Sequence, residues 1–241
     1  MPVDSLPRAP SSRAPSYKTA LIVGAGSGLS ASLARLLSRE GMTVALAARH
    51  PDKLKALCEE TGATAFGCDA QDEAQVARLF ESLDREFGSP DVVIYNASDR
   101  ARGPFATLDP DEVRRTLIVS AFGAFLVAQR AVTRMLVKGS GAILFTGASA
   151  SLKGYAESAP FAMGKFALRG MAQSMARELA PKGIHVAHFV IDGGLRQRGR
   201  ADPDDSTLDP DAIAQTYLNV LVQPRSAWTW EVELRPWVER F

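Results

Sequence analysis

Short apolar segments alternate with longer segments of helical period along most of the chain. The apolar segments are rich in valine, isoleucine, alanine and phenylalanine, which is typical of strands covered by helices on both faces. The predicted strands are 19–24, 43–48, 63–68, 91–96, 141–147, 184–190 and 229–234. The predicted helices are 29–40, 52–61, 72–87, 110–137, 158–180 and 210–222. Repeated strand–helix units predict an α/β fold, in which a single doubly wound domain has a parallel sheet of about seven strands and helices on both faces.

Acidic residues, prolines and glycines mark the ends of several predicted helices. Asp109-Pro110 and Asp209-Pro210 precede helical segments, where a carboxylate can accept hydrogen bonds from free backbone N–H groups. Gly41 and Gly62 follow helical segments, as left-handed C-terminal caps often require. These signals support the boundaries that the apolar pattern predicts.

Two segments fall outside this alternation. Residues 1–17 hold Pro2, Pro7, Pro10 and Pro15 among serines and arginines, and such a composition cannot bury enough apolar surface to become ordered. We therefore expect a flexible leader there and a single domain over 18–241. The stretch 193–209 is long, polar and rich in glycine, proline and aspartate, which predicts a lid loop over a binding site.

The composition excludes several classes of protein. The chain of 241 residues has 28 Lys+Arg against 27 Asp+Glu, so its net charge of +1 gives no reason to expect nucleic acid or an anionic membrane as partner. We find no run of about 18 apolar residues that could span a bilayer. Two cysteines, Cys58 and Cys68, are too few for a disulfide scaffold, which favours reduced thiols in the cytoplasm.

The first predicted strand runs into a glycine-rich turn, Gly24-Ala25-Gly26-Ser27-Gly28-Leu29, and a helix follows. Glycines at such a turn let the backbone approach a pyrophosphate, and the helix N-terminus offers free N–H groups. A tight turn needs glycine whether or not a ligand binds, but the place of this turn after the first strand favours nucleotide binding.

The end of the second predicted strand bears on which dinucleotide binds. An acidic residue there would hydrogen-bond the ribose 2′-OH of NAD, whereas an arginine accommodates the 2′-phosphate of NADP. The chain has Ala47-Ala48-Arg49-His50 at this point, with no carboxylate. Arg49 therefore favours NADP over NAD, the alternative being an ordinary solvated arginine.

With these motifs in order, residues 18–235 resemble a short-chain dehydrogenase/reductase. The resemblance rests on Gly24-x-x-x-Gly28-Leu29, Asp69-Ala70, Tyr95-Asn96-Ala97-Ser98 and Lys165. It implies a Rossmann fold and an NAD(P)-dependent oxidoreductase. It also implies that Gly24, Ser27, Gly28 and Leu29 face the pyrophosphate, Asp69 and Ala70 the adenine, Asn96 and Ala97 the adenine ribose region, and Lys165 the nicotinamide ribose.

The catalytic positions depart from the family pattern, in which tyrosine precedes lysine by four residues on one helix face. A lysine so placed can lower the pKa of the phenol that exchanges a proton with the substrate oxygen. Here Phe161 occupies that position, Ala148 the family's serine position and Ser120 its helix asparagine position. The third glycine of the first loop is replaced by Ser30.

Three functional hypotheses remain open. The first is an NADP-dependent oxidoreductase acting on a small carbonyl or alcohol, in which Ser149 or Tyr155 provides the proton, with Lys165 or a water completing the relay. The second is reduction of an activated double bond, as in an enone, which needs no strong acid at position 161. The third is a catalytically impaired dinucleotide-binding sensor or scaffold protein, which the joint change of three catalytic positions favours.

Other features of the sequence bear on acid–base chemistry, metal binding and oligomeric state. Four tyrosines and three histidines leave few acid–base candidates, and we expect no histidine near the site. His185 and His188 lie three apart on a strand without a cysteine or carboxylate cluster, so we expect no metal. The apolar helices 110–137 and 158–180 resemble those that pair across a two-fold interface in this family, which implies a homodimer or homotetramer.

Overall fold

A computed structural model of the protein describes residues 17–197 and 199–239. Almost all of the leader expected at residues 1–17 lies outside the described residues. The described strands form one parallel sheet in the order β3-β2-β1-β4-β5-β6-β7. Their bounds are β1 Thr19–Val23, β2 Thr43–Ala48, β3 Thr64–Gly67, β4 Val92–Tyr95, β5 Gly141–Thr146, β6 Ile184–Ile191 and β7 Glu231–Leu234. All seven predicted strands are confirmed within about two residues, the usual uncertainty of strand and helix ends.

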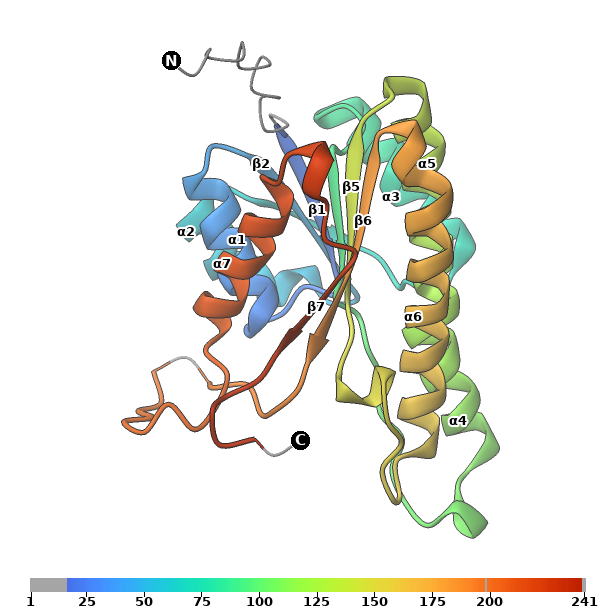
Figure 1. The fold of residues 1–241 in the computed structure, drawn as a ribbon. Coiled ribbons are helices and arrows are strands. Elements are labelled where there is room, and N and C mark those ends of the chain that lie inside the picture. The colour runs from blue at the N-terminus through green and yellow to red at the C-terminus, as the bar shows by residue number, and fades with distance from the viewer. Residues whose placement is uncertain (1–16, 198, 240–241) are drawn as a thin grey trace, which may run out of the picture.

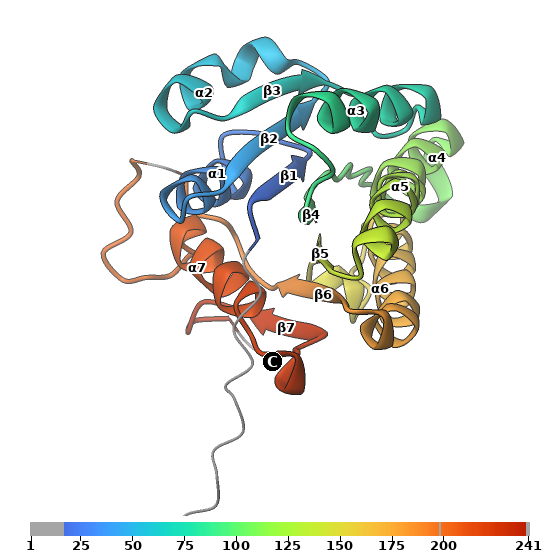
Figure 2. The ribbon, with the colours of Figure 1, turned by 90° about the horizontal axis from the view of Figure 1, so that it is seen from above.

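Helices cover both faces of the sheet (Figure 1). The helices are α1 Leu29–Arg39, α2 Lys55–Thr61, α3 Glu73–Glu86, α4 Pro110–Leu117, α5 Gly123–Lys138, α6 Ala159–Leu179 and α7 Pro210–Leu221. Seen from above, α1, α2 and α7 lie on one face, and α3, α5 and α6 lie on the other (Figure 2). Adjacent strand residues point to opposite faces, so Ile22 packs in one apolar core and Leu21 in the other. The predicted doubly wound α/β domain is confirmed.

Carboxylates at the helix starts act as the sequence predicts. The side chain of Asp109 accepts a hydrogen bond from the Asp111 N–H (2.8 Å), and that of Asp209 accepts one from the Asp211 N–H (2.9 Å). Gly62 ends α2 in the left-handed conformation, with φ of 70°. Local capping and the apolar period therefore agree on these boundaries.

The predicted helix 110–137 contains an irregular turn. A π-helical turn, Ile118–Phe122, separates α4 from α5. The hydroxyl of Tyr95 donates to the carbonyl oxygen of Val119 (2.5 Å) in this turn, and a side chain at Gly123 would crowd that hydroxyl. Close packing of the helix on the end of β4 thus accounts for a distortion that the apolar period does not reveal.

Length and apolar composition alone would allow the stretch Pro110–Lys138 to cross a membrane, so the expectation that no such stretch exists needs correction. In the fold, one side of α5 packs into the core against the sheet, through Leu126, Val127, Ala131 and Met135. That packing is typical of a core helix in a globular domain, which also passes a test of length and composition.

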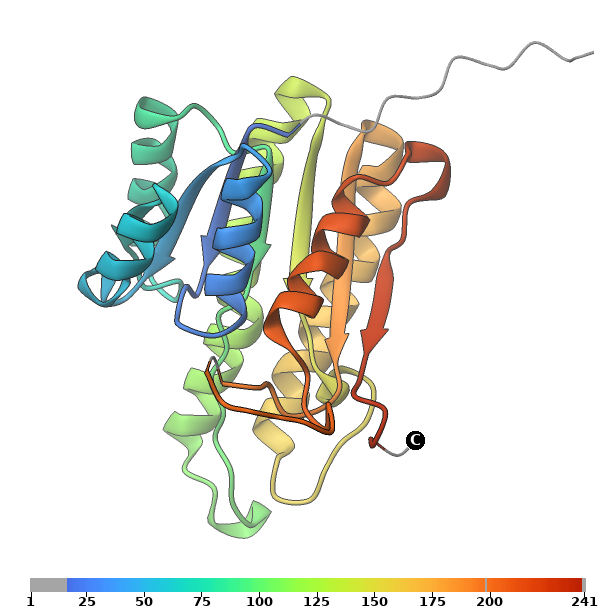
Figure 3. The same ribbon diagram turned by 90° about the vertical axis from the view of Figure 1, so that its left-hand side faces the viewer.

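The carboxyl ends of the strands lie together at one end of the molecule, where the longer loops gather (Figure 3). The described part of the predicted lid loop, 193–209, lies at this end and is anchored by a bridge between Leu195 and Leu208 and by an ion pair between Arg196 and Asp209. Ligands of doubly wound sheets bind outside these strand ends, so this end is the place to look for a site.

Candidate active site

The turn after β1 has the geometry of a pyrophosphate cradle. Gly24 adopts φ of 81°, and a side chain there would overlap the backbone of Ala97. A side chain on Gly26 or Gly28 would meet no described atom within 4 Å, so these glycines border open space. Gly28 begins α1 without a side-chain cap, and the first turn holds no acidic residue. The free N–H groups at this helix start therefore fit an anionic group, as the sequence predicts.

Ser30, at the position of the family's third glycine, braces this turn. Its hydroxyl donates to the carbonyl oxygen of Gly24 (3.1 Å) and accepts a hydrogen bond from the side-chain amide of Asn96 (2.7 Å). The Asn96 N–H also donates to the carbonyl oxygen of Val23 (2.8 Å). Ser30 thus links the loops after β1 and β4, a role that its departure from the family's glycine does not reveal in the sequence.

A cavity of about 270 Å³ lies over the ends of β1, β2, β3 and β4. Six residues predicted to contact the cofactor line it together: Gly24, Arg49, Asp69, Ala70, Asn96 and Ala97. Arg115 also lines it, but its guanidinium is paired with Asp99 (2.8 Å). Arg49 has no ion-pair partner among residues 17–197 and 199–239, and no carboxylate follows β2 directly. We call this cavity the adenosine cavity, after the part of a dinucleotide that the sequence predicts for its lining residues.

A second space of about 330 Å³, the inner cavity, lies next to the first and shares Gly24 and Asn96 with it. Gly28 and Leu29 line it at one end, and Thr146, Ala148, Phe161 and Lys165 line it at the other. Ser27 borders a third cavity, beside the start of α1. The structure therefore places the predicted pyrophosphate and nicotinamide residues along one continuous set of strand ends.

Lys165 lies almost fully buried on α6, with 3% of the residue exposed. Its Nζ donates to the main-chain oxygen of Thr146 (2.8 Å) at the end of β5. Burial, and secondarily the positive charge of Arg100, lower the pKa of Lys165 to about 8. The ammonium is therefore held at the inner cavity and releases its proton more readily than an exposed lysine.

The family's tyrosine position holds a ring without a hydroxyl. Phe161 is buried, and two cations flank its ring: Lys165 Nζ lies 5.7 Å from the ring centre and Arg100 Cζ lies 4.0 Å from it. Ser120, at the family's asparagine position, is buried in the π-helical turn, and its hydroxyl has no hydrogen-bond partner in the described chain. It faces Gly164 of α6 and lines neither of these cavities, so the structure does not bring Ser120 to the site.

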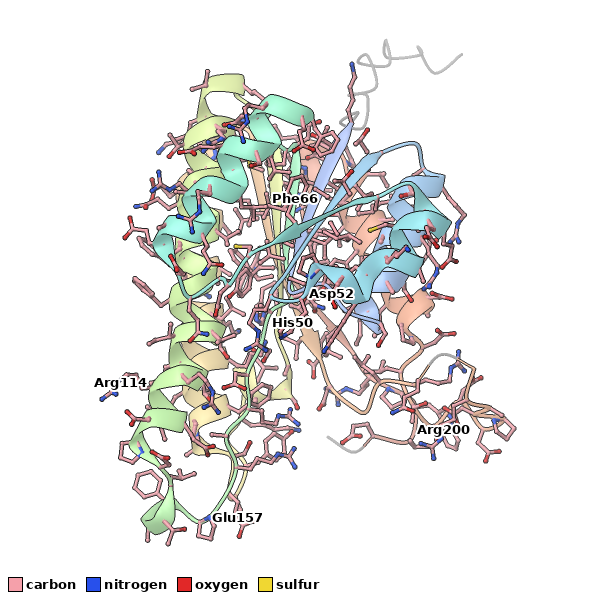
Figure 4. All side chains as sticks on the ribbon, turned by 180° about the vertical axis from the view of Figure 1, so that it is seen from behind. His50, Asp52, Phe66, Arg114, Glu157 and Arg200 are labelled. Atoms are coloured by element: carbon pink, nitrogen blue, oxygen red, sulfur yellow. The ribbon has the colours of Figure 1, made fainter. Side chains whose placement is uncertain are left out.

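The two other proton-donor candidates lie farther out. Ser149 and Tyr155 line a cavity of about 540 Å³, the outer cavity, together with Phe161 and Arg100, but Lys165 does not line it. Tyr155 is 45% exposed, and its ring lies 5.6 Å from the Nζ of Lys153. The loop that carries Tyr155 extends to Glu157 at the end of the molecule where Arg200 of the lid loop also lies (Figure 4). Lys165 and the two hydroxyl candidates therefore occupy neighbouring cavities rather than one.

No histidine of the described residues lines the adenosine, inner or outer cavity, but one lies buried directly beneath the inner cavity. His188 of β6 is fully buried beneath Gly147, where any side chain would overlap the imidazole. Its Nε2 lies 3.3 Å from the hydroxyl of Ser151, and its Nδ1 lies 3.0 Å from a carboxylate oxygen of Glu231. Glu231 in turn forms an ion pair with Arg169 (2.6 Å). Burial lowers the pKa of His188 to about 4, although Glu231 opposes the shift.

Parallel strand pairing explains this cluster. His188 pairs in register with Phe145 of β5 on one side and with Glu231 of β7 on the other. His185, three residues earlier, instead stacks on Trp228 with ring centres 4.6 Å apart. Within the described chain, no group of three or more His, Cys, Asp or Glu residues could hold a metal ion.

Comparisons with known proteins agree on one family. Residues 18–194 match the short chain dehydrogenase family. An uncharacterized oxidoreductase of Staphylococcus aureus strain N315 is 28% identical over 226 residues, which cover 91% of this chain and 97% of that protein.

Solved structures give the same result. A short-chain dehydrogenase from Rhodopseudomonas palustris superposes with a TM-score of 0.81 and 35% identity, covering 92% of this chain and all of that one (100%). A metagenomic short-chain oxidoreductase in complex with NADP superposes with a TM-score of 0.82 and 25% identity, covering 92% and 98% of the two chains. The resemblance first seen in the motifs is confirmed, and the chain belongs to the short-chain dehydrogenase family.

Proposed function

We propose that the protein is an NADP-dependent oxidoreductase that acts on a small carbonyl, alcohol or enone substrate with an altered proton-donor site. The observation that carries the proposal is the intact cradle: free N–H groups at the start of α1 border the same strand ends as Arg49, Asp69 and Lys165. The related metagenomic oxidoreductase solved with NADP supports the choice of cofactor class.

Each predicted residue has a defined task in this proposal. Gly24, Ser27, Gly28 and Leu29 bind the pyrophosphate through the turn and the α1 N-terminus. Asp69, Ala70, Asn96 and Ala97 form the adenosine cavity, and Lys165 holds the nicotinamide ribose. The bound nicotinamide supplies the hydride chemistry, and the chain supplies orientation and charge.

The preference for NADP rests on Arg49. An unpaired guanidinium at the end of β2 can donate hydrogen bonds to a 2′-phosphate, whereas the 2′-OH of NAD would find no carboxylate at this point. A phosphate contact of this kind is a charge-assisted hydrogen bond, stronger than one between neutral groups.

Proton transfer must differ from the family pattern, because Phe161 has no acidic proton. Lys165, with its pKa lowered to about 8, is a proton source beside the inner cavity. Ser149 and Tyr155 could act on a substrate that extends into the outer cavity. Reduction of an activated double bond would tolerate this arrangement well, because it needs no acid at position 161.

One alternative function is supported by the residues at the family's catalytic positions. Phe161, Ala148 and Ser120 together replace three groups of the family's proton machinery, and a single positioned acid or base is worth about 10²–10⁴-fold in rate. A dinucleotide-binding sensor or scaffold protein would retain the cradle and need none of these hydroxyls.

Two measurements separate the candidates. NADPH should raise the melting temperature in both cases, whereas steady NADPH oxidation with a panel of carbonyl and enone compounds is expected only of the enzyme. In Phe161→Tyr we expect carbonyl reduction to rise about 10²-fold, since the new phenol would lie beside two cations. Phe105→Tyr, at an exposed position that lines neither the inner nor the outer cavity, is the matched control and should change nothing.

Each result of these two measurements favours or excludes one of the candidate functions. NADPH stabilisation without turnover in any variant would favour the sensor, and it would also show that more than one group is missing. If NADPH gave no stabilisation, both candidate functions would fail.

We propose further that the protein works in the cytoplasm as a homodimer or homotetramer, without nucleic acid, membrane or metal as partner. Cys58 and Cys68 are unpaired thiols, as a reducing compartment would leave them. The outer faces of α5 and α6 expose apolar residues, including Phe125, Leu136 and Phe166. Light scattering at micromolar concentration should give at least twice the chain mass.

A further inference from the structure

The guanidinium of Arg100 lies where the inner and outer cavities meet. The residue lines both cavities, and its Cζ lies 4.0 Å above the ring of Phe161. Arg100 belongs to the loop after β4, whereas Phe161 belongs to α6, so two distant segments bring this pair together. A cation over an aromatic face is attracted by the ring quadrupole, which helps to hold the side chain at this junction.

Arg100 has no acidic partner among the described residues. Its neighbour in sequence, Asp99, is paired with Arg115 (2.8 Å) and lines the adenosine cavity instead. Partial burial of the guanidinium and the positive charge of Arg102 both lower the pKa of Arg100, and no carboxylate offsets them. The five N–H donors of its guanidinium are therefore available to a ligand.

Charge is distributed unevenly between the two cavities. The charged side chains that line the inner cavity in the described chain are Arg100 and Lys165, both cationic. The outer cavity adds Arg102 and the carboxylates of Glu157, Asp192 and Glu239. Asp192 lies 3.9 Å from Lys153 and 3.5 Å from Arg235, so its charge is already balanced. The inner cavity is thus more positively charged than the outer cavity.

We propose that the substrate carries a carboxylate or phosphate group and that Arg100 binds this anion at the junction of the two cavities. The inference rests on the proposed function, because it names the substrate class of the same site. A guanidinium matches both anions with paired N–H donors, and the buried ammonium of Lys165 adds attraction from the inner side. In this arrangement the ring of Phe161 positions the guanidinium of Arg100 through the cation–π contact.

The experiment compares pairs of ligands that share a ketone and differ in whether they carry an anionic group. Pyruvate and methyl pyruvate share one carbonyl, and dihydroxyacetone phosphate and dihydroxyacetone share another. Each is titrated by calorimetry into the full chain, with saturating NADP⁺ and without it, for the natural protein, Arg100→Gln and Arg102→Gln. Of these two cavities, Arg102 lines only the outer one. Arg102→Gln is therefore the control variant, in which we expect a smaller loss of anion affinity.

We expect the natural protein to bind the anionic member of a pair at least about tenfold more tightly than the neutral one. Arg100→Gln should abolish that preference and leave the affinity for NADP⁺ unchanged, whereas Arg102→Gln should weaken the anion by less than about threefold. Preference in the pyruvate pair alone identifies a carboxylate, and preference in the phosphate pair alone identifies a phosphate. Arg100 is exposed, so the variant is expected to fold, and its melting temperature checks this.

Two results would overturn the proposal. The first is an equal affinity for the charged and neutral members of both pairs. The second is a loss of NADP⁺ affinity in Arg100→Gln with the anion preference intact, which would make Arg100 a ligand of the cofactor. If NADP⁺ did not bind but the anion preference persisted, the proposed function would fail while the anion site would stand.

Discussion

The loops that follow β1 and β2 match the family's dinucleotide-binding pattern, whereas the loop after β5 and the start of α6 depart from its catalytic pattern. On the first side, Gly24 and the start of α1 present backbone groups, and Ser30 braces the turn. On the second side, Lys165 is in place, but Ala148 and Phe161 carry no hydroxyl. The two regions meet at the inner cavity.

The difference shows which kind of site tolerates substitution. A cradle built from backbone N–H groups depends on backbone conformation, so changing it also disturbs the fold. A proton donor depends on one side-chain hydroxyl, and phenylalanine fills nearly the same volume as tyrosine. Phe161 is well packed against Arg100, so the catalytic side could change its chemistry at little cost in stability.

The largest effect should follow from breaking the cradle. In Gly24→Ala, an alanine would have to adopt φ of 81° and its Cβ would overlap the backbone of Ala97. Left-handed strain costs about 1–2 kcal/mol, and relief of the overlap should bring the total loss to about 3 kcal/mol. Urea unfolding measures the loss, and NADPH titration should show weakened binding as well.

Gly26→Ala is the matched control for this change. A side chain at Gly26 meets no described atom within 4 Å, so the free energy of unfolding should change by less than about 1 kcal/mol. Equal losses in the two variants would contradict the idea that the backbone conformation at Gly24 is what the cradle requires.

A smaller loss of stability, at acid pH, is expected from His188, which lies buried beneath Gly147 at the inner cavity. Burial lowers the folded-state pKa of His188 from 6.5 to about 4. Between these values the unfolded chain binds a proton that the folded chain does not, so stability falls as pH falls from 6.5 toward 4. We expect His188 to account for about 2 kcal/mol of lost stability between pH 7 and pH 5, and His188→Gln should lack this loss.

Urea unfolding at the two pH values tests this expectation. The charged groups that face the imidazole are Glu231, Lys165 and Arg169, and the net result of burial and these charges is the lowered pKa. His50→Gln, at an exposed position after β2, should retain the whole acid loss. An acid loss in His188→Gln as large as in the natural protein would show that His188 is not the group responsible.

The same two regions differ in how far the sequence could predict them. The strands, the turn at Gly24 and the gathering of Arg49 and Asp69 follow from local patterns and from parallel pairing. The contact of His188 with Glu231 depends on which strand lies beside β6, and that of Arg100 with Phe161 joins residues 61 positions apart. No local signal marks such pairs, because their positions follow from packing of elements far apart in the chain.

The smallest expected effect is on the affinity for NADPH, and it tests the role assigned to Arg49. In Arg49→Gln, loss of one charge-assisted contact should weaken NADPH about tenfold, or about 1.4 kcal/mol, and leave the affinity for NADH unchanged. Arg39→Gln removes a charge from the far end of α1 and should alter neither affinity, which separates a local contact from a general change in potential. Fluorescence titration with both cofactors gives the ratio directly. An equal loss for NADPH and NADH would mean that Arg49 contacts a part that the two cofactors share, and the assignment of the 2′-phosphate to this arginine would then be wrong.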